Sequence, residues 1–131
     1  MDLYEGLSST VEAVVKEEDT ALAYGSGSVH VFATPAMIAL MEKASLSAVN
    51  LHLDEGYTSV GTSIDIKHVS ATPVGMKVKV KSELIKIDGK KLSFKVEAYD
   101  ESGLIGKGTH ERYIVCVEKF IKNAEAKKSG K

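Results

Sequence analysis

Residues 34–42 read TPAMIALME, a nearly continuous apolar run that carries one carboxylate, Glu42. The run predicts a helix, because Thr34 is a good N-cap residue and Pro35 suits the first helical position, where its missing N–H would be unpaired anyway. We expect this helix to end at about Val49 or Asn50. A helix that is apolar around most of its circumference belongs in a protein core. Burying an ionised carboxylate there costs free energy unless the group is paired with a cation, is solvated or has a shifted pKa. Glu42 is therefore a candidate functional residue.

The rest of the chain alternates with the period of β-strands. The Asp88-Gly89 pair predicts a tight hairpin, and residues 100–103 predict a second turn. The apolar alternation changes phase near Ile85, which indicates a bulge or a strong twist. We expect strands at about residues 9–16, 57–70, 76–87, 92–98 and 104–117.

One long apolar helix and a meander of antiparallel strands predict an α+β domain in which a curved sheet wraps around the helix. A chain of 131 residues suits a single domain, residues 1–131, with a frayed basic tail at residues 122–131. Such a sheet leaves one strand edge open. Pairing two edges across a twofold axis removes both, so we expect a homodimer.

The composition argues against several classes of protein. A formal net charge of −1 argues against a surface for nucleic acid or for an anionic membrane. Residues 1–12 lack the pattern of a signal peptide, and the single cysteine, Cys116, cannot form an internal disulfide, so we expect a cytoplasmic protein. The four histidines lack the short helical spacings of zinc sites, and we predict no metal.

The alternation of residues 64–68 places His68 on the apolar face with Ile64 and Ile66. His68 is then either a core histidine bonded to a backbone carbonyl or part of a functional site. Thr34 has the simpler interpretation of a helix cap, and Glu42 that of a carboxylate reaching solvent or an arginine. Together, a carboxylate and an imidazole on apolar faces indicate a polar site in a hydrophobic pocket.

Residues 109–112 place two further polar side chains, His110 and Arg112, on one face of a strand. This pair is either solvated surface or an arginine positioned beside an acidic ligand.

Several motifs together resemble one family. They are Val31-Phe32-Ala33-Thr34, Met41-Glu42, Val60-Gly61-Thr62, His68, Ala71-Thr72-Pro73, Gly108-Thr109-His110-Glu111-Arg112 and Glu118-Lys119-Phe120. In this order, over about residues 31–120, they resemble the hot-dog thioesterases related to fluoroacetyl-CoA thioesterase. The resemblance implies a hot-dog fold, a dimer with active sites at the subunit interface, and hydrolysis of an acyl-CoA thioester. No metal or bound cofactor is implied, since coenzyme A is part of the substrate.

The resemblance also implies roles for individual residues. Thr34, Glu42 and His68 match the catalytic threonine, glutamate and histidine of the family. Gly61 matches a glycine whose backbone helps to hold the thioester carbonyl, and Arg112 matches a substrate-side arginine. Small residues at 25–28 stand where the fluoroacetyl-specific relative has bulky aromatic lid residues, so the resemblance does not extend to a preference for fluoroacetyl.

The chemistry of thioester hydrolysis suits these residue types. His68 is the natural base, and Glu42 either orients His68 or attacks the carbonyl itself. Eight residues at ~1.5 Å rise place Thr34 and Glu42 ~12 Å apart along the helix. Either the substrate lies between them, or the site combines two subunits. If Thr34 and His68 meet across the interface, mixing Thr34→Ala and His68→Ala chains restores activity.

These observations predict an acyl-CoA thioesterase that acts on a small acyl group. The alternative is a non-catalytic hot-dog protein that binds acyl-CoA or another small ligand without hydrolysing it.

Overall fold

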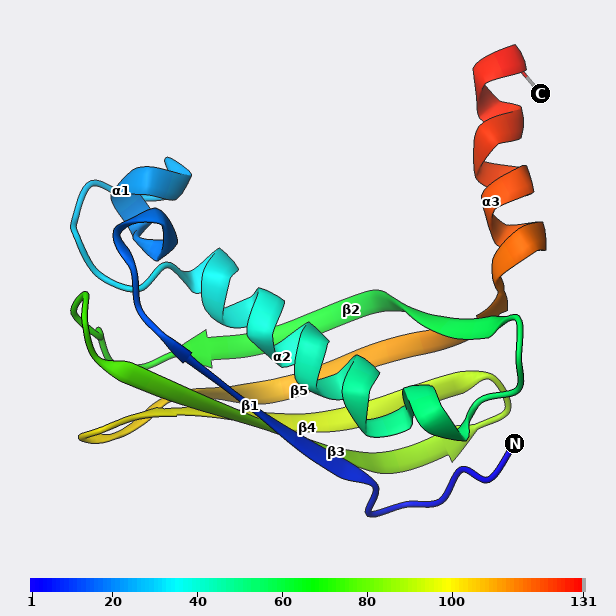
Figure 1. The fold of residues 1–131 in the computed structure, drawn as a ribbon, viewed down its shortest axis with the longest axis horizontal. Helices are drawn as coiled ribbons and strands as arrows, with labels where there is room; N and C mark the ends of the chain where they lie inside the picture. Colours follow the sequence, from blue (N-terminus) through cyan, green and yellow to red (C-terminus); the bar gives the residue numbers. More distant parts are fainter. Residues whose placement is uncertain (131) are drawn as a thin grey trace.

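A five-stranded antiparallel sheet curves around one long helix, α2, in a computed structural model that describes residues 1–130 (Figure 1). The strands are β1 (Ser8–Val14), β2 (Tyr57–His68), β3 (Lys77–Asp88), β4 (Lys91–Asp100) and β5 (Gly103–Cys116). The helices are η1 (Glu17–Asp19), α1 (Ala21–Tyr24), α2 (Thr34–Val49), η2 (Asn50–His52), α3 (Val117–Glu125) and η3 (Ala126–Ser129). The α+β prediction is therefore confirmed.

The strand order in the sheet is β1-β3-β4-β5-β2. Strands β3, β4 and β5 form the predicted meander, but β2 crosses over to pair with β5 instead of β3. Strand β1 pairs with β3 on the other side, so the expected meander comprises three of the five strands. The two strands at the sheet edges are thus β1 and β2.

Helix α2 begins and ends where its sequence predicted, but Thr34 does not cap it. Ala33 is the N-cap, while Thr34 and Pro35 are already helical. The face of α2 that meets the sheet consists mainly of small and flexible side chains: Ala36, Met37, Met41, Ala44, Ser45, Ala48 and Val49. This face packs mainly against β3 and β1. Because the opposite face is exposed, the expectation of a fully enclosed helix is wrong for the single chain.

One close approach fixes the position of α2 over the sheet. A Cβ atom at Gly106 of β5 would lie 2.5 Å from Met37 Sδ, well inside the normal contact distance. Only a glycine leaves room for the buried Met37 side chain at this point. Gly106 is also the cross-strand partner of His68, so this contact lies directly beside the end of β2.

The sheet contains three register shifts, one of them between Ala98 and Tyr99 of β4, and the shift in β2 bears on the site. The register of β3 and β4 shifts between Leu84 and Lys86, as the phase change predicted. A second shift, which the sequence did not reveal, lies in β2 between Gly61 and Ser63.

The C-terminal end differs from expectation. The final strand ends at Cys116, and helices α3 and η3 occupy most of the segment expected to be frayed. Lys131, the last residue of that segment, lies outside the described residues. Helix α3 stands away from the sheet in Figure 1. Within residues 1–130, no helix has the length and apolar character needed to cross a membrane.

Candidate functional site

The hydroxyl of Thr34 and the imidazole of His68 form a hydrogen bond at the N-terminal end of α2. Thr34 Oγ1 lies 2.7 Å from His68 Nδ1. Thr34 can reach His68 because Ala33, not Thr34, occupies the cap position, which leaves the hydroxyl free of the helix end. This hydrogen bond joins the last residue of β2 to the first residue of α2, and the two residues lie 34 positions apart in the sequence.

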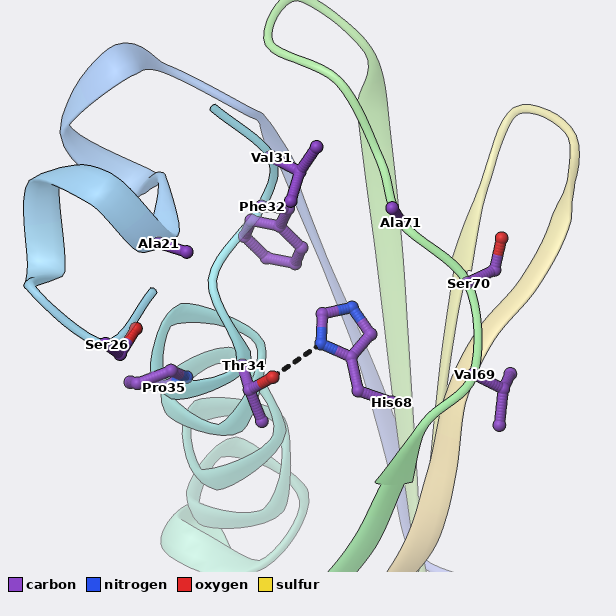
Figure 2. A pocket seen from close by; sticks show the side chains of 10 residues that line it. All are labelled: Ala21, Ser26, Val31, Phe32, Thr34, Pro35, His68, Val69, Ser70 and Ala71. Atoms are coloured by element: carbon purple, nitrogen blue, oxygen red, sulfur yellow. Dashed lines mark hydrogen bonds between the residues drawn. The ribbon is translucent and has the colours of Figure 1, made fainter. Parts of the chain in front are cut away.

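A pocket of about 350 Å³ surrounds this pair (Figure 2). Its walls come from α1, the segment before α2, the start of α2, and the loop after β2. The lining residues are Ala21, Ser26, Val31, Phe32, Thr34, Pro35, His68, Val69, Ser70 and Ala71. The lining combines apolar residues with four whose side chains are polar, Ser26, Thr34, His68 and Ser70, so it suits a small ligand that has both an apolar and a polar part.

The surroundings of His68 favour its neutral form. Burial lowers the pKa of His68 below its ordinary value, because desolvation penalises the charged imidazolium. Its second ring nitrogen, Nε2, is buried and has no hydrogen-bond partner among residues 1–130. A neutral imidazole with one nitrogen engaged by a hydroxyl can accept a proton, as a general base does.

The other three expected site residues form a second cluster further along the same helix and strand. Arg112 Nη1 lies 3.9 Å from Glu42 Oε2, and Gly61 lies beneath them as the strand neighbour of Arg112. The Glu42 side chain is 45% exposed while that of Arg112 is 7% exposed. The expectation of a buried Glu42 is therefore wrong for the single chain, and the alternative of a carboxylate that reaches an arginine describes its contacts.

Arg112 is held rigidly. Its Nε donates to Ser59 Oγ at 2.7 Å and its Nη2 donates to Ser59 O at 2.8 Å. His110 Nδ1 lies 2.8 Å from Ser63 O and therefore donates to it, which leaves His110 Nε2 to accept from Arg112 Nη1 at 3.2 Å. His110 and Arg112 are only 2% and 6% exposed, so their interpretation as solvated surface is wrong.

Charge and burial both shape this second cluster. Desolvation lowers the pKa of His110, and the nearby Arg112 charge lowers it further, so the imidazole is neutral when it accepts from the guanidinium. Desolvation also lowers the pKa of Arg112, while the Glu42 carboxylate opposes that shift. The result is a fixed positive group that faces a more exposed carboxylate.

A side chain at position 61 would come too close to its neighbours in the second cluster. A Cβ atom there would lie 2.6 Å from Glu42 Oε2 and 3.2 Å from His110 Cε1. A hollow of about 250 Å³ opens over this glycine, lined by Glu42, Gly61, Thr62, Ser63, Ile64 and His110.

The structure thus divides the five expected site residues into two clusters within one chain. Thr34 and His68 lie together, so the idea that these two meet across an interface is wrong. Glu42, Gly61 and Arg112 lie together elsewhere. Ser59, for which no sequence pattern gives a signal, also belongs to the second cluster, as does His110, which alternation places beside Arg112.

The bulge in β2 decides which way these clusters face. Gly61 and His68 are seven positions apart, so strict alternation would place them on opposite faces of the strand. The bulge between Gly61 and Ser63 adds one residue and restores the phase. Gly61 and Ile64 consequently lie opposite the buried Arg112 and His110, and both clusters face the helix side of the sheet.

Within residues 1–130, no three His, Cys, Asp or Glu side chains lie close enough together to hold a metal ion. The chemical groups that the two clusters offer are an imidazole, hydroxyls, a carboxylate and a guanidinium.

Comparison with known proteins gives one consistent result. A family model described as fluoroacetyl-CoA-specific thioesterase matches residues 15–118. The fluoroacetyl-CoA thioesterase of Streptantibioticus cattleyicolor is 46% identical over 90 residues, which cover 69% of this chain and 65% of that protein. The chain thus matches just under two thirds of the length of this curated relative.

Solved structures are similar over nearly the whole chain. A variant of the fluoroacetyl-CoA thioesterase in complex with acetyl-CoA is 36% identical, with a TM-score of 0.90, over 95% of this chain and 98% of that chain. A thioesterase superfamily member from Thermus thermophilus is 31% identical, with a TM-score of 0.89, over 100% of both chains.

Proposed function

Because this chain belongs to the family of fluoroacetyl-CoA-specific thioesterases, we propose that it hydrolyses the thioester of a small acyl-CoA to a free acid and coenzyme A. The observation that supports this proposal most directly is the Thr34–His68 hydrogen bond at the wall of a pocket lined by both apolar and polar side chains. The relatives act on, or were solved with, acyl groups of two carbons, which suits a pocket of modest size.

The proposed reaction uses His68 as general base. His68 takes a proton as the nucleophile, either water or the Thr34 hydroxyl, attacks the thioester carbonyl carbon. The tetrahedral intermediate then collapses, the C–S bond breaks, and the imidazolium returns the proton to the leaving thiolate. If Thr34 is the nucleophile, water hydrolyses the acyl-threonine in a second round. These steps require only protein groups and water, so we propose that no metal or cofactor takes part.

The second cluster supplies charge in this proposal. Gly61, which lacks a side chain, lets a thioester carbonyl approach its backbone. Arg112 stays charged, and its contacts with Ser59 and His110 hold it on the substrate side. Glu42 is free to orient a water molecule or the His68 imidazole, or to attack the carbonyl directly.

We propose that a homodimer joins the two clusters. Strand β2 is a sheet edge, and an exposed edge is a natural site for pairing with a second copy. Antiparallel pairing of β2 with its copy, centred on Asp65, sets Ile64 opposite Ile66 of the partner subunit and, because the bulge takes up one residue at Thr62, sets His68 opposite Gly61 of the partner subunit. Because the bulge turns both residues to the helix side, Glu42 of the partner subunit then approaches the Thr34–His68 pair. One dimer would contain two such combined sites.

The direct test is release of free thiol from a panel of acyl-CoAs that differ in acyl length. We expect turnover with short acyl groups, and a His68→Ala variant should lose about 10²-fold or more in turnover while it keeps its fold. Glu42→Gln, which is nearly isosteric, should also lose most activity. If the wild-type protein binds acyl-CoA without releasing thiol, the non-catalytic binding module is the correct alternative. Wild-type turnover in His68→Ala would remove His68 from its role as base.

A further inference from the structure

Two separate cavities share the side chain of Phe32. The first is the pocket of about 350 Å³ that contains Thr34 and His68. The second is a hollow of about 140 Å³ between β1, α1, α2 and β3, and it contains neither of them. Among the residues that line this second hollow are Ala13, Val15, Tyr24, Ala36, Leu40 and Val78. Phe32 lines both cavities, so its ring stands between them.

The side chain of Phe32 is buried and in contact with His68, so it forms a fixed side of the pocket. Phe32 is 3% exposed, and its N–H donates to Thr72 O at 2.8 Å. Its ring centroid lies 6.5 Å from that of His68 with an interplanar angle of 83°, an edge-to-face contact. In Figure 2 the ring lies between Ala21 and His68, on the α1 side of the pocket.

The second hollow suits the continuation of an alkyl chain. Its walls are almost entirely aliphatic or aromatic, with Asp19 as the one charged residue among those that line it. An acyl group whose carbonyl lies beside Thr34 and His68 meets Phe32 before it can reach this space. A short acyl chain fits in front of the ring, whereas a longer chain needs the volume behind it.

Building on the proposed thioesterase activity, we propose that Phe32 determines substrate specificity by closing the acyl pocket against the hollow behind it and so restricting the enzyme to short-chain acyl-CoAs. Neither the Thr34–His68 pair nor the second cluster would set the chain length. The same chain would accept longer acyl groups once the ring is shortened.

The test compares acetyl-CoA with octanoyl-CoA as substrates of the wild-type protein and of the Phe32→Leu and Phe32→Ala variants. The ratio of kcat/KM for octanoyl-CoA to that for acetyl-CoA should rise about tenfold or more, since a hydrophobic pocket discriminates by this order for a single methylene. Removal of a buried aromatic side chain also lowers stability. Leu84→Ala, a core truncation on β3 that lines neither cavity, is the control and should leave the ratio unchanged.

A second variant refills the hollow. Ala39 also lines it from α2 and is exposed, so Phe32→Leu combined with Ala39→Phe should return the ratio toward the wild-type value. An unchanged ratio in folded Phe32→Leu, alongside wild-type release of thiol from acetyl-CoA, would overturn the role of Phe32 and leave the thioesterase proposal standing. Absence of thiol release from every acyl-CoA by the wild-type protein would overturn both.

Discussion

His68 combines a single hydrogen bond, to Thr34, with burial of its second nitrogen. Burial lowers the pKa of His68, so the imidazole stays neutral at a lower pH than an exposed histidine does. Its ordinary pKa is 6.5. The protonation state that a general base requires is therefore already present near neutral pH.

The lowered pKa of His68 predicts how activity falls at acidic pH. The pH profile of kcat/KM with a short acyl-CoA should rise through a midpoint below 6.5, the ordinary value, because the neutral imidazole is the active form. The measurement is thiol release in buffers from about pH 4.5 to pH 8, and the residual activity of His68→Ala should lack this limb. A midpoint above the ordinary histidine value would contradict the prediction.

The same shift predicts how stability depends on pH. The folded-state pKa of His68 lies below that of the unfolded chain, so the unfolded state binds more protons as the pH falls. Stability from the neutral His68 is thus complete above the unfolded pKa and is lost as the pH drops through and below it. Urea unfolding of wild type and His68→Gln should show a smaller loss of stability on acidification in the variant. An equal loss in both would contradict the assignment.

Gly61 gives a residue-scale prediction in which activity and stability separate. In Gly61→Ala the new Cβ would meet Glu42 Oε2, the flexible end of a half-exposed side chain, so the carboxylate can move aside. We expect the free energy of unfolding to change by less than about 1 kcal/mol and activity to fall at least about tenfold. Thr58→Ala in the same strand is the control. Full activity in Gly61→Ala would show that neither the bare backbone nor the position of Glu42 matters.

At the scale of elements, the docking of α2 on the sheet sets the distance between Thr34 and His68. Thr34 belongs to α2 and His68 to β2, and the only direct side-chain bond between them is 2.7 Å long. Met37, one turn into α2, packs over Gly106, which pairs with His68. The helix must approach the sheet closely at this end for the hydrogen bond to form.

Gly106→Ala tests this docking. The added methyl group would overlap Met37 Sδ and should destabilise the protein by about 1–3 kcal/mol through overpacking. Activity should also fall, because α2 is displaced from the end of β2. Combining Gly106→Ala with Met37→Val should recover part of both losses, since the two changes share one contact. Denaturant unfolding of the four proteins measures the coupling, and strictly additive effects would contradict it.

At the scale of the whole molecule, each of the two clusters on one chain supplies only half of an active site if a dimer forms that site. Thr34 and His68 lie within one half, and Glu42 and Arg112 lie within the other. This arrangement specifies which inactive variants complement each other and which do not.

We therefore expect His68→Ala and Glu42→Gln chains to complement. Each mixed dimer would hold one site with both native residues, and random pairing makes about half of the dimers mixed, so roughly a quarter of wild-type activity should return. Co-expression with two different tags and purification through both isolates the mixed dimers, in which about half of wild-type activity should return because one of the two sites is intact. Thr34→Ala with His68→Ala is the negative control, because those residues share one half. Activity in the control pair, or a fully active monomer, would contradict the proposed assembly.

The sequence by itself determined the local architecture. The apolar run at 34–49 fixed the central helix, and the Asp88-Gly89 turn fixed a hairpin, because helix period and turn geometry depend on neighbouring residues. The phase change near Ile85 likewise located one bulge. Alternation also put His110 and Arg112 on one face, although it did not distinguish a buried pair from a solvated one.

Only the tertiary structure decided how the site residues are grouped. Pairing of β2 with β5, an unrecognised bulge after Gly61, and helical placement of Thr34 bring His68 to Thr34 and Arg112 to Glu42. The bulge reverses the alternation on which a sequence-based assignment of faces depends, and nothing in the residues Gly61, Thr62 and Ser63 requires it. Such contacts join positions far apart in the chain, so they depend on how the whole sheet closes around α2 and not on any local pattern.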